Sequence, residues 1–149
     1  MRKSIFDTIA EIHFHSALDL CAGSGSLGIE ALSRGCDYVT FIEKNSAVAR
    51  VLKNNIKRLH LDERASILIG DARSIIKGLN KADLIFIDPP YRTQLATGLL
   101  RLIYKYSILK REGIIIVESS KRNEPVFDKF RISNRRVIGE TVLNYLKWA

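Results

Sequence analysis

A carboxylate, two prolines and a tyrosine stand together after an apolar run, in the segment Asp88-Pro89-Pro90-Tyr91. Pro89 keeps Asp88 out of the helical region, and both prolines fix φ and remove a backbone donor. The Asp88 carboxylate and the Pro89 carbonyl could then accept hydrogen bonds from an exocyclic amino group of a nucleobase, while Tyr91 offers a flat surface for stacking. On its own, the segment is equally consistent with an ordinary proline turn.

A glycine-rich loop lies earlier in the chain, between an expected strand and an expected helix. It reads Asp19-Leu20-Cys21-Ala22-Gly23-Ser24-Gly25-Ser26-Leu27-Gly28, and Glu43 follows Gly23 by 20 residues. The glycines of this G-x-G-x-x-G pattern permit a tight turn and a close approach of a ligand to the backbone. An acidic residue at the end of the next strand can bind two ribose hydroxyls. A dinucleotide and S-adenosylmethionine both remain candidates for this loop.

Asp19 favours S-adenosylmethionine. A dinucleotide would place its pyrophosphate against the loop, where a nearby carboxylate repels it. S-adenosylmethionine instead carries an α-ammonium group and a sulfonium, which an acidic environment attracts. Asp71-Ala72, after a third apolar run, could accept a hydrogen bond from the adenine amino group. The structural alternative for Asp19 is a capping or turn role.

Short apolar runs alternate with helical patterns along the chain. We expect helices over Ser4–Ile12, Leu27–Arg34, Asn45–Leu59, Ala72–Leu79 and Gln94–Leu109. We expect strands over Ala17–Cys21, Tyr38–Ile42, Ile67–Ile69, Leu84–Ile87 and Ile114–Val117. This alternation predicts an α/β fold, doubly wound around a mostly parallel sheet. Phe130–Ile138 and Thr141–Trp148, joined by Gly139-Glu140, predict a C-terminal antiparallel hairpin.

An acidic residue lies within or just after the end of each expected parallel strand. These residues are Asp19, Glu43, Asp71, Asp88 and Glu118. Ligands of open α/β sheets bind outside the carboxyl ends of the strands, so the set predicts a pocket for a ligand rich in donors or positive charge. The alternative is that these residues cap the helices that follow.

The chain has 149 residues, which predicts a single domain over 1–149, and a formal net charge of +8. Such an excess suggests a polyanionic partner, most simply nucleic acid. Seven Lys and Arg lie within 119–149, and Arg135-Arg136 could contact phosphates there. Solvated surface charge is the alternative.

Other features exclude some classes of protein. Two cysteines without C-x-x-C spacing and three histidines without a ligand spacing predict neither a disulfide scaffold nor a metal site. No apolar run reaches the roughly 18 residues of a membrane span. Asp7 and Glu11 interrupt any signal sequence at the start, so we expect a cytoplasmic protein. Nothing in the sequence predicts an oligomeric state.

The motifs D-L-C-A-G-S-G-S-L-G, I-E-K, G-D-A and D-P-P-Y together resemble those of class I S-adenosylmethionine-dependent amino-methyltransferases. The longer segments L-D-L-C-A-G-S-G-S-L-G-I-E-A-L-S-R-G, V-T-F-I-E-K and L-I-F-I-D-P-P-Y resemble the RsmD-type family, which methylates the exocyclic N2 of a guanine in bacterial 16S ribosomal RNA. The resemblance implies a Rossmann-like fold, S-adenosylmethionine as cofactor, and 16S rRNA or a small-subunit assembly as partner.

The same resemblance implies roles for individual residues. The target base would meet Asp88, Pro89, Pro90 and Tyr91. The cofactor would meet Asp19, Ala22, Gly23, Ser24, Gly25, Glu43, Lys44, Asp71 and Ala72. Members of the family normally carry a basic β-hairpin before the R-x-x-x-F segment, with which this sequence begins at Arg2.

Other functions remain open from the sequence. D-P-P-Y is shared with adenine-N6 methyltransferases acting on DNA or RNA. A nicotinamide-dependent oxidoreductase would explain the glycine loop and Glu43 but not Asp88-Pro89-Pro90-Tyr91. A non-catalytic RNA-binding module is the third alternative.

Overall fold

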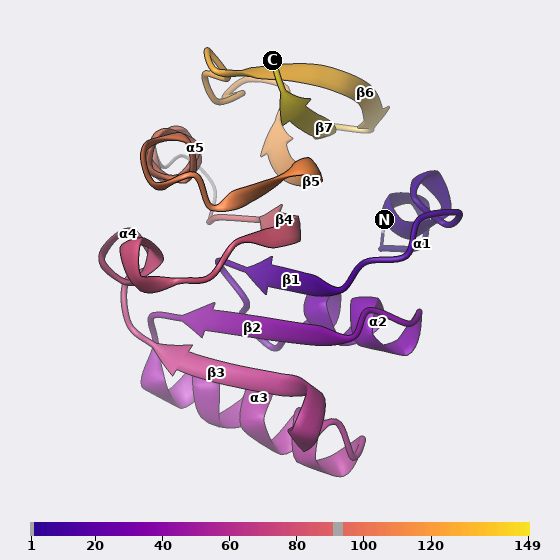
Figure 1. Ribbon diagram of the computed structural model, residues 1–149, viewed down its shortest axis with the longest axis vertical. Helices are drawn as coiled ribbons and strands as arrows, with labels where there is room; N and C mark the ends of the chain where they lie inside the picture. Colours follow the sequence, from indigo (N-terminus) through magenta and orange to yellow (C-terminus); the bar gives the residue numbers. More distant parts are fainter. Residues whose placement is uncertain (1, 91–93) are drawn as a thin grey trace.

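The computed structural model describes residues 2–90 and 94–149, which form a seven-stranded sheet in the order β3-β2-β1-β4-β5-β7-β6 (Figure 1). Strands β1 to β5 pair in parallel, and β7 is antiparallel to both β5 and β6. The strands are Ser16–Asp19 (β1), Tyr38–Glu43 (β2), Ala65–Ile69 (β3), Ala82–Ile87 (β4), Leu109–Ser120 (β5), Phe130–Ile138 (β6) and Thr141–Trp148 (β7). The predicted α/β fold and its C-terminal antiparallel hairpin are confirmed. That the protein is a single domain stays a prediction.

Helices cover both faces of the sheet. Apolar residues of α1 (Arg2–Thr8), α2 (Ser26–Ser33) and α3 (Ser46–Arg58) pack in one core cluster. Those of α4 (Ala72–Ile75) and α5 (Leu95–Tyr106) pack in a second cluster on the opposite face. Short 3₁₀ helices span Asp62–Arg64 and Ile76–Gly78.

Strand β4 shows why the apolar runs are continuous. Leu84 and Phe86 belong to the first cluster, whereas Ile85 and Ile87 belong to the second. Since successive side chains of a strand point to opposite faces, a strand buried on both sides needs apolar residues at every position. The four residues are 0–1% exposed, so β4 lies at the centre of the core.

The structure confirms the helix predicted over Asn45–Leu59 as α3. The side chain of Asn45 caps its first turn by accepting hydrogen bonds from the backbone N–H groups of Ala47 and Val48. Leu52 and Ile56 face the core, and the last turn carries basic residues that complement the helix dipole.

Two predicted boundaries near β5 were wrong. Helix α5 ends at Tyr106 rather than Leu109, and Ser107 has a left-handed φ of 51°. Strand β5 begins at Leu109 and runs well beyond the predicted Ile114–Val117. The register against β4 shifts between Ala82 and Leu84, and Gly113 lies in this irregular part of β5. Gly113 therefore lies inside β5, where the pairing of the strand is irregular.

Two predicted helices were too long. Helix α1 ends at Thr8 instead of Ile12 and begins at Arg2, and the backbone carbonyl of Ser4 within it accepts a hydrogen bond from the Thr8 hydroxyl. The segment predicted as a helix over Ala72–Leu79 divides into α4 and the following 3₁₀ turn. Both predictions rested on apolar spacing, which a short helix followed by turns also satisfies.

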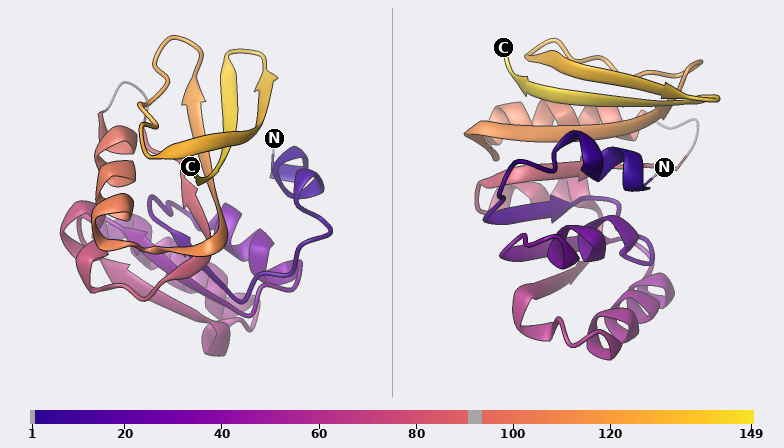
Figure 2. Two further views of the ribbon diagram at one scale, coloured as in Figure 1. Left: turned by 45° about the horizontal axis from the view of Figure 1, so that its top comes forward. Right: turned by 90° about the vertical axis from the view of Figure 1, so that its right-hand side faces the viewer.

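The hairpin and α1 lie side by side, although the chain separates them widely (Figure 2). The buried Tyr145 hydroxyl on β7 donates a hydrogen bond to the Ile5 carbonyl at 3.2 Å. Within residues 2–90 and 94–149, no helix combines the length and apolar character that crossing a membrane requires.

Two glycines in helices test the packing of α2 against the sheet. A Cβ on Gly28 would lie 2.3 Å from a ring carbon of the buried Phe41, whereas a Cβ on Gly98 in α5 would meet nothing within 4 Å. We expect Gly28→Ala to destabilise the protein by about 1–3 kcal/mol. Gly98→Ala should stabilise it by about 0.4–1 kcal/mol, because it reduces the entropy of the unfolded chain. Urea denaturation of the two variants checks both signs, and equal effects would contradict this account of the packing.

Candidate active site

The strand order reverses between β1 and β4, and acidic residues gather there. Asp19 is the last residue of β1, and Asp88 comes directly after β4. Glu43 ends the neighbouring strand β2. The three carboxyl groups are close enough for the charges of Asp88 and Glu43 to influence the ionisation of Asp19. This is the crevice in which open α/β sheets bind ligands.

The glycine loop turns sharply between β1 and α2. Gly23 and Gly25 have φ values of 57° and 90°, in the left-handed region that favours glycine. The Gly25 N–H donates to the Ala22 carbonyl at 2.9 Å, which closes the turn. The Gly28 N–H, in the first turn of α2, donates to the Asp19 carboxyl at 3.2 Å. Asp19 therefore has the structural role that the sequence left open, and it joins β1 to α2.

Asp19 also has an oxygen available to a ligand. Its side chain is 1% exposed, and burial raises its pKa to about 7 against the opposing effect of the Gly28 N–H, with smaller contributions from the charges of Asp88 and Glu43. Among the described residues, none hydrogen-bonds its second oxygen, Oδ1. A buried carboxyl oxygen without a partner is costly, and a cationic donor would satisfy it.

Glu43 holds the glycine loop from the side of β2. Its Oε1 accepts from the Gly23 N–H at 2.9 Å, and its Oε2 accepts from the Asn45 N–H at 2.7 Å. A carboxylate has about four acceptor sites on its two oxygens, so both oxygens can still accept a hydroxyl. Glu43 thus orders the loop and retains the capacity to bind a pair of hydroxyls.

Asp71 caps α4, and Ala72 begins that helix. Asp71 Oδ1 accepts from the Arg73 N–H at 2.9 Å, and Oδ2 pairs with the Arg73 guanidinium at 2.8 Å. These contacts lower the pKa of Asp71 to about 2, with a smaller contribution from the positive charge of Lys44. Ala72 is buried, so the adenine role of this pair stays a prediction.

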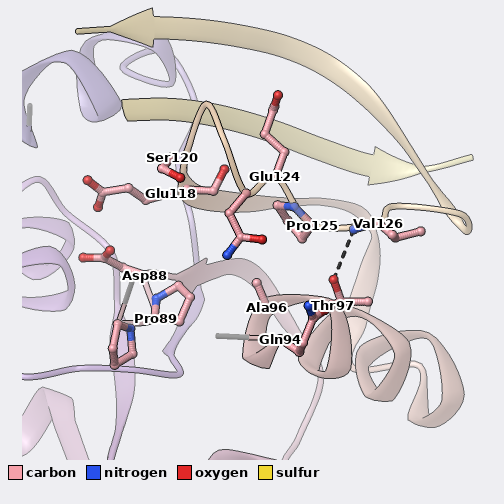
Figure 3. Close-up of a pocket in the computed structure, with 13 residues that line it drawn as sticks. Asp88, Pro89, Gln94, Ala96, Thr97, Glu118, Ser120, Glu124, Pro125 and Val126 are labelled. Carbon is pink, nitrogen blue, oxygen red and sulfur yellow. Dashed lines mark hydrogen bonds between the residues drawn. The ribbon is translucent and has the colours of Figure 1, made fainter. Parts of the chain in front are cut away.

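A cavity of about 460 Å³ opens beside Asp88 (Figure 3). Its walls come from the end of β4, the start of α5, the end of β5 and the loop that follows. The lining residues are Asp88, Pro89, Pro90, Gln94, Ala96, Thr97, Glu118, Ser119, Ser120, Asn123, Glu124, Pro125 and Val126. The structure thus places the predicted Asp88-Pro89-Pro90 segment in the wall of a cavity that polar side chains also line.

Glu118 lies beside Asp88 in the wall of this cavity (Figure 3). Burial raises the pKa of the Glu118 carboxyl well above its usual value, and the hydrogen bond to Asp88 and its negative charge add to the effect. A protonated Glu118 can donate its O–H to the Asp88 carboxylate. The sequence identified Glu118 as an acidic residue at the end of the fifth strand, but no sequence pattern indicated that it would contact Asp88.

Two sets of contacts hold the loop after β5 over the cavity. The Val126 N–H donates to the Thr97 hydroxyl on α5 at 3.2 Å. The Glu124 carboxylate accepts from Asn144 at 3.1 Å and pairs with Arg135 at 3.0 Å, which fastens the loop to the hairpin. The sequence did not identify the contributions of Gln94, Asn123 and Glu124 to this cavity, because no motif marks them.

The structure brings together most of the residues predicted for the site, but not all can be placed. Tyr91 lies outside the described residues. Ser24 is exposed on the glycine loop, and Lys44 is exposed after β2. Arg135 pairs with Glu124, and Arg136 donates to the Thr8 hydroxyl, so their contact with phosphates stays a prediction.

Known proteins match this chain over almost its whole length. The family described as Conserved hypothetical protein 95 matches residues 1–147. The chain is a member of this family of RsmD-type methyltransferases. Ribosomal RNA small subunit methyltransferase D of Haemophilus influenzae is 38% identical over 126 residues, which cover 81% of this chain and 65% of that protein. The protein of the same name from Buchnera aphidicola is 31% identical over 148 residues, covering 98% of this chain and 78% of its own length.

A solved structure supports the same family. The Escherichia coli protein described as methyltransferase yhhF is 29% identical, with a TM-score of 0.90 over 99% of this chain and 86% of that one. Membership of the RsmD-type family favours a methyltransferase over the nicotinamide-dependent oxidoreductase, in agreement with the carboxyl groups beside the glycine loop. The predicted Rossmann-like methyltransferase fold is confirmed.

The raised pKa of Asp19 makes the stability of this RsmD-type protein depend on pH. A raised pKa means that the folded state binds the proton more tightly, so this contribution to stability is lost as the pH rises from about 4 to about 7. Asp19→Asn is neutral throughout and keeps an acceptor oxygen for Gly28. Its free energy of unfolding, measured in urea, should rise relative to that of the unmodified protein over this interval. Parallel pH profiles of the two proteins would contradict the assignment.

Proposed function

We propose that this protein transfers a methyl group from S-adenosylmethionine to the exocyclic N2 amino group of a guanine in 16S ribosomal RNA. The observation that carries the proposal is the cavity lined by Asp88 and Glu118. Asp88 lies close enough to Asp19 for its charge to influence that carboxyl, whose buried Oδ1 has no hydrogen-bond partner among the described residues. A cofactor with a cationic end and an acceptor with an amino group would meet between them.

The residues around the glycine loop fit S-adenosylmethionine. Asp19 Oδ1 is a buried acceptor suited to the α-ammonium group, and Gly23 and Gly25 present no side chain at two positions of the turn. Glu43 has capacity for the ribose hydroxyls, while Asp71 and Ala72 would lie toward the adenine. The cofactor, when bound, supplies an electrophilic methyl group on its sulfonium.

Asp88 would act on the target base. Its carboxylate would accept a hydrogen bond from the amino group, and the Pro89 carbonyl would accept a second. Glu118, protonated because of its raised pKa, would donate to the other Asp88 oxygen and hold that carboxylate in place. The amino nitrogen, drawn toward a tetrahedral geometry, is then oriented for in-line attack on the methyl carbon.

Methyl transfer to the amino group releases one proton, which the site must accept. The cofactor would supply its methyl group to the amino nitrogen and leave as the neutral thioether S-adenosylhomocysteine, and the nitrogen would become cationic. It then loses one proton, for which Asp88 is the nearest base in this arrangement. No base is needed before the attack, because the cationic product is much more acidic than the neutral amine.

Two observations support RNA as the substrate: the names of the relatives and the net charge of the chain. The relatives from Haemophilus influenzae and Buchnera aphidicola are named as small-subunit ribosomal RNA methyltransferases. The net charge of +8 suits a polyanionic substrate. An adenine-N6 target would meet the same acceptors, so the methylated nucleoside must be identified directly.

Asp88→Asn tests the catalytic role. Asn keeps one acceptor oxygen but removes the negative charge, and loss of one preorganised electrostatic contact typically slows a reaction by about 10²–10³. We expect methyl transfer to small-subunit rRNA to slow by this factor while the affinity for S-adenosylhomocysteine stays nearly unchanged. Radiolabelled methyl transfer and calorimetry provide the two measurements.

Asp62→Asn is the matched control, because Asp62 lies in the 3₁₀ turn after α3 and away from this cavity. The control should transfer methyl groups at the unmodified rate. Full turnover by Asp88→Asn would refute the mechanism. Nuclease digestion and chromatography of the product should yield N2-methylguanosine, and N6-methyladenosine would instead identify an adenine methyltransferase.

Glu43→Ala tests the cofactor site. The variant removes an acceptor for the ribose hydroxyls and also frees the Gly23 and Asn45 N–H groups. Calorimetry should show weaker binding of S-adenosylhomocysteine by about 2–3 kcal/mol, as expected for the loss of charge-assisted hydrogen bonds. Unchanged affinity in a variant that remains folded by circular dichroism would remove Glu43 from the site.

A further inference from the structure

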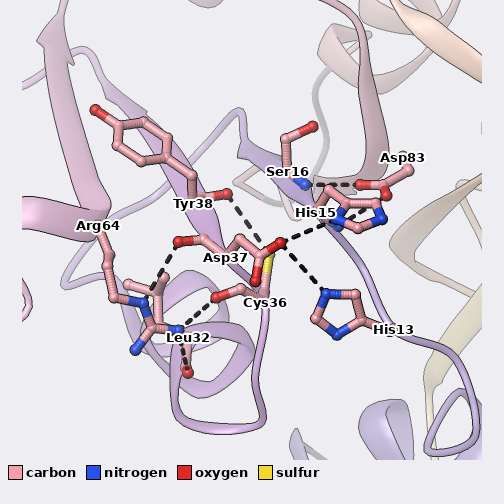
Figure 4. A network of polar contacts seen from close by, with 9 residues as sticks. All are labelled: His13, His15, Ser16, Leu32, Cys36, Asp37, Tyr38, Arg64 and Asp83. Atoms are coloured by element: carbon pink, nitrogen blue, oxygen red, sulfur yellow. Dashed lines mark hydrogen bonds and ion pairs between the residues drawn. The ribbon is translucent and has the colours of Figure 1, made fainter.

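Two histidines and an aspartate converge at the opposite edge of the sheet from the proposed active site. His13 and His15 precede β1, and Asp37 precedes β2, so all three lie where these parallel strands begin (Figure 4). All three are exposed. None of them takes part in the glycine loop or in the cavity beside Asp88.

The donor atoms have the spacing of a metal-ligand set. His13 Nε2 lies 3.3 Å and His15 Nδ1 lies 2.9 Å from the same oxygen, Asp37 Oδ2. One donor atom from each residue falls within 4.8 Å of the other two. Tetrahedral zinc at about 2.0–2.1 Å from nitrogen places neighbouring ligand atoms about 3.3–3.5 Å apart. Small side-chain rotations would therefore accommodate an ion between them.

The backbone around the cluster is held in place. The Asp37 N–H donates to the Phe14 carbonyl at 3.2 Å, and the Tyr38 N–H donates to the His15 carbonyl at 3.1 Å. The Asp83 carboxylate, on β4, accepts from the His15 N–H at 2.8 Å. These bonds fix the two segments that carry the ligands, so that little ordering is left to binding.

Arg64 holds the segment that carries Asp37 through hydrogen bonds to backbone carbonyls. Its guanidinium donates to the carbonyls of Leu32 and Cys36, and more weakly to that of Asp37 at 3.4 Å (Figure 4). Cys36 is buried, and its Sγ donates to the Tyr38 carbonyl at 3.5 Å, so this thiol is not one of the ligands. The ligand atoms of the cluster are therefore two imidazole nitrogens and one carboxylate oxygen.

We propose that His13, His15 and Asp37 form a binding site for a zinc ion. Two imidazole nitrogens and a carboxylate suit zinc, whereas magnesium prefers oxygen ligands alone. Because the cluster is exposed, water completes the coordination. The ion ties the segment after α1 to the start of β2, and the site is independent of the function proposed above.

Zinc titration of the untagged protein tests the site. Calorimetry should show one ion bound per chain, with no comparable binding of magnesium. Loss of groups that merely support a zinc ligand costs about 10–100-fold in metal affinity, so His15→Ala and Asp37→Ala should each weaken zinc binding at least about tenfold. The side chains of these residues are 70% and 57% exposed, and the variants should fold normally.

His60→Ala is the matched control, because the third histidine follows α3 and lies outside the cluster. It should bind zinc as the unmodified protein does. Zinc should also raise the melting temperature of the unmodified protein and of His60→Ala, but not that of Asp37→Ala, because an ion bound only to the folded state stabilises it. Absence of zinc binding, or equal zinc affinity in all four proteins, would overturn the proposal.

Discussion

The hydrogen bond from the Gly28 N–H to the buried Asp19 carboxyl is the interaction on which the site depends. It joins the end of β1 to the first turn of α2 at 3.2 Å. Helix α2 can lie this close only because Gly28 has no side chain to meet Phe41 on β2. With both ends anchored, residues 22–25 must turn tightly, which explains the left-handed conformations of Gly23 and Gly25.

The acidic residues at this edge combine structural and binding roles. Asp19 uses one oxygen for α2 and leaves the other buried without a partner among the described residues. Glu43 bridges the glycine loop and the start of α3, while both its oxygens retain acceptor capacity. A buried acceptor without a donor destabilises the folded state. A ligand with donors and positive charge would remove that cost. The unpartnered Asp19 oxygen therefore lowers the stability of the free protein and raises its affinity for such a ligand.

The C-terminal hairpin contacts two distant parts of the chain, the loop after β5 and helix α1. Through Glu124, it holds the loop that forms one wall of the cavity, and through Tyr145 it contacts α1 at the start of the chain. Its outer strand β6 is exposed and rich in arginine. Charges on an edge strand discourage pairing with other chains. Arg135 therefore has a structural explanation in its pairing with Glu124, whatever part the surface takes in binding RNA.

Local pattern was enough to predict the α/β fold, the terminal hairpin, helix α3 and the acidic ends of the strands. Apolar periodicity, glycine and proline act over a few residues, and these features depend on nothing more distant. Only the tertiary structure decided the length of β5, because the shift in its register is set by pairing with β4. It also decided which groups meet: Glu118 with Asp88, and His15 with Asp37. The members of each pair lie at or near the ends of different strands, and their contact is set by the order and register of the sheet, which local sequence does not encode.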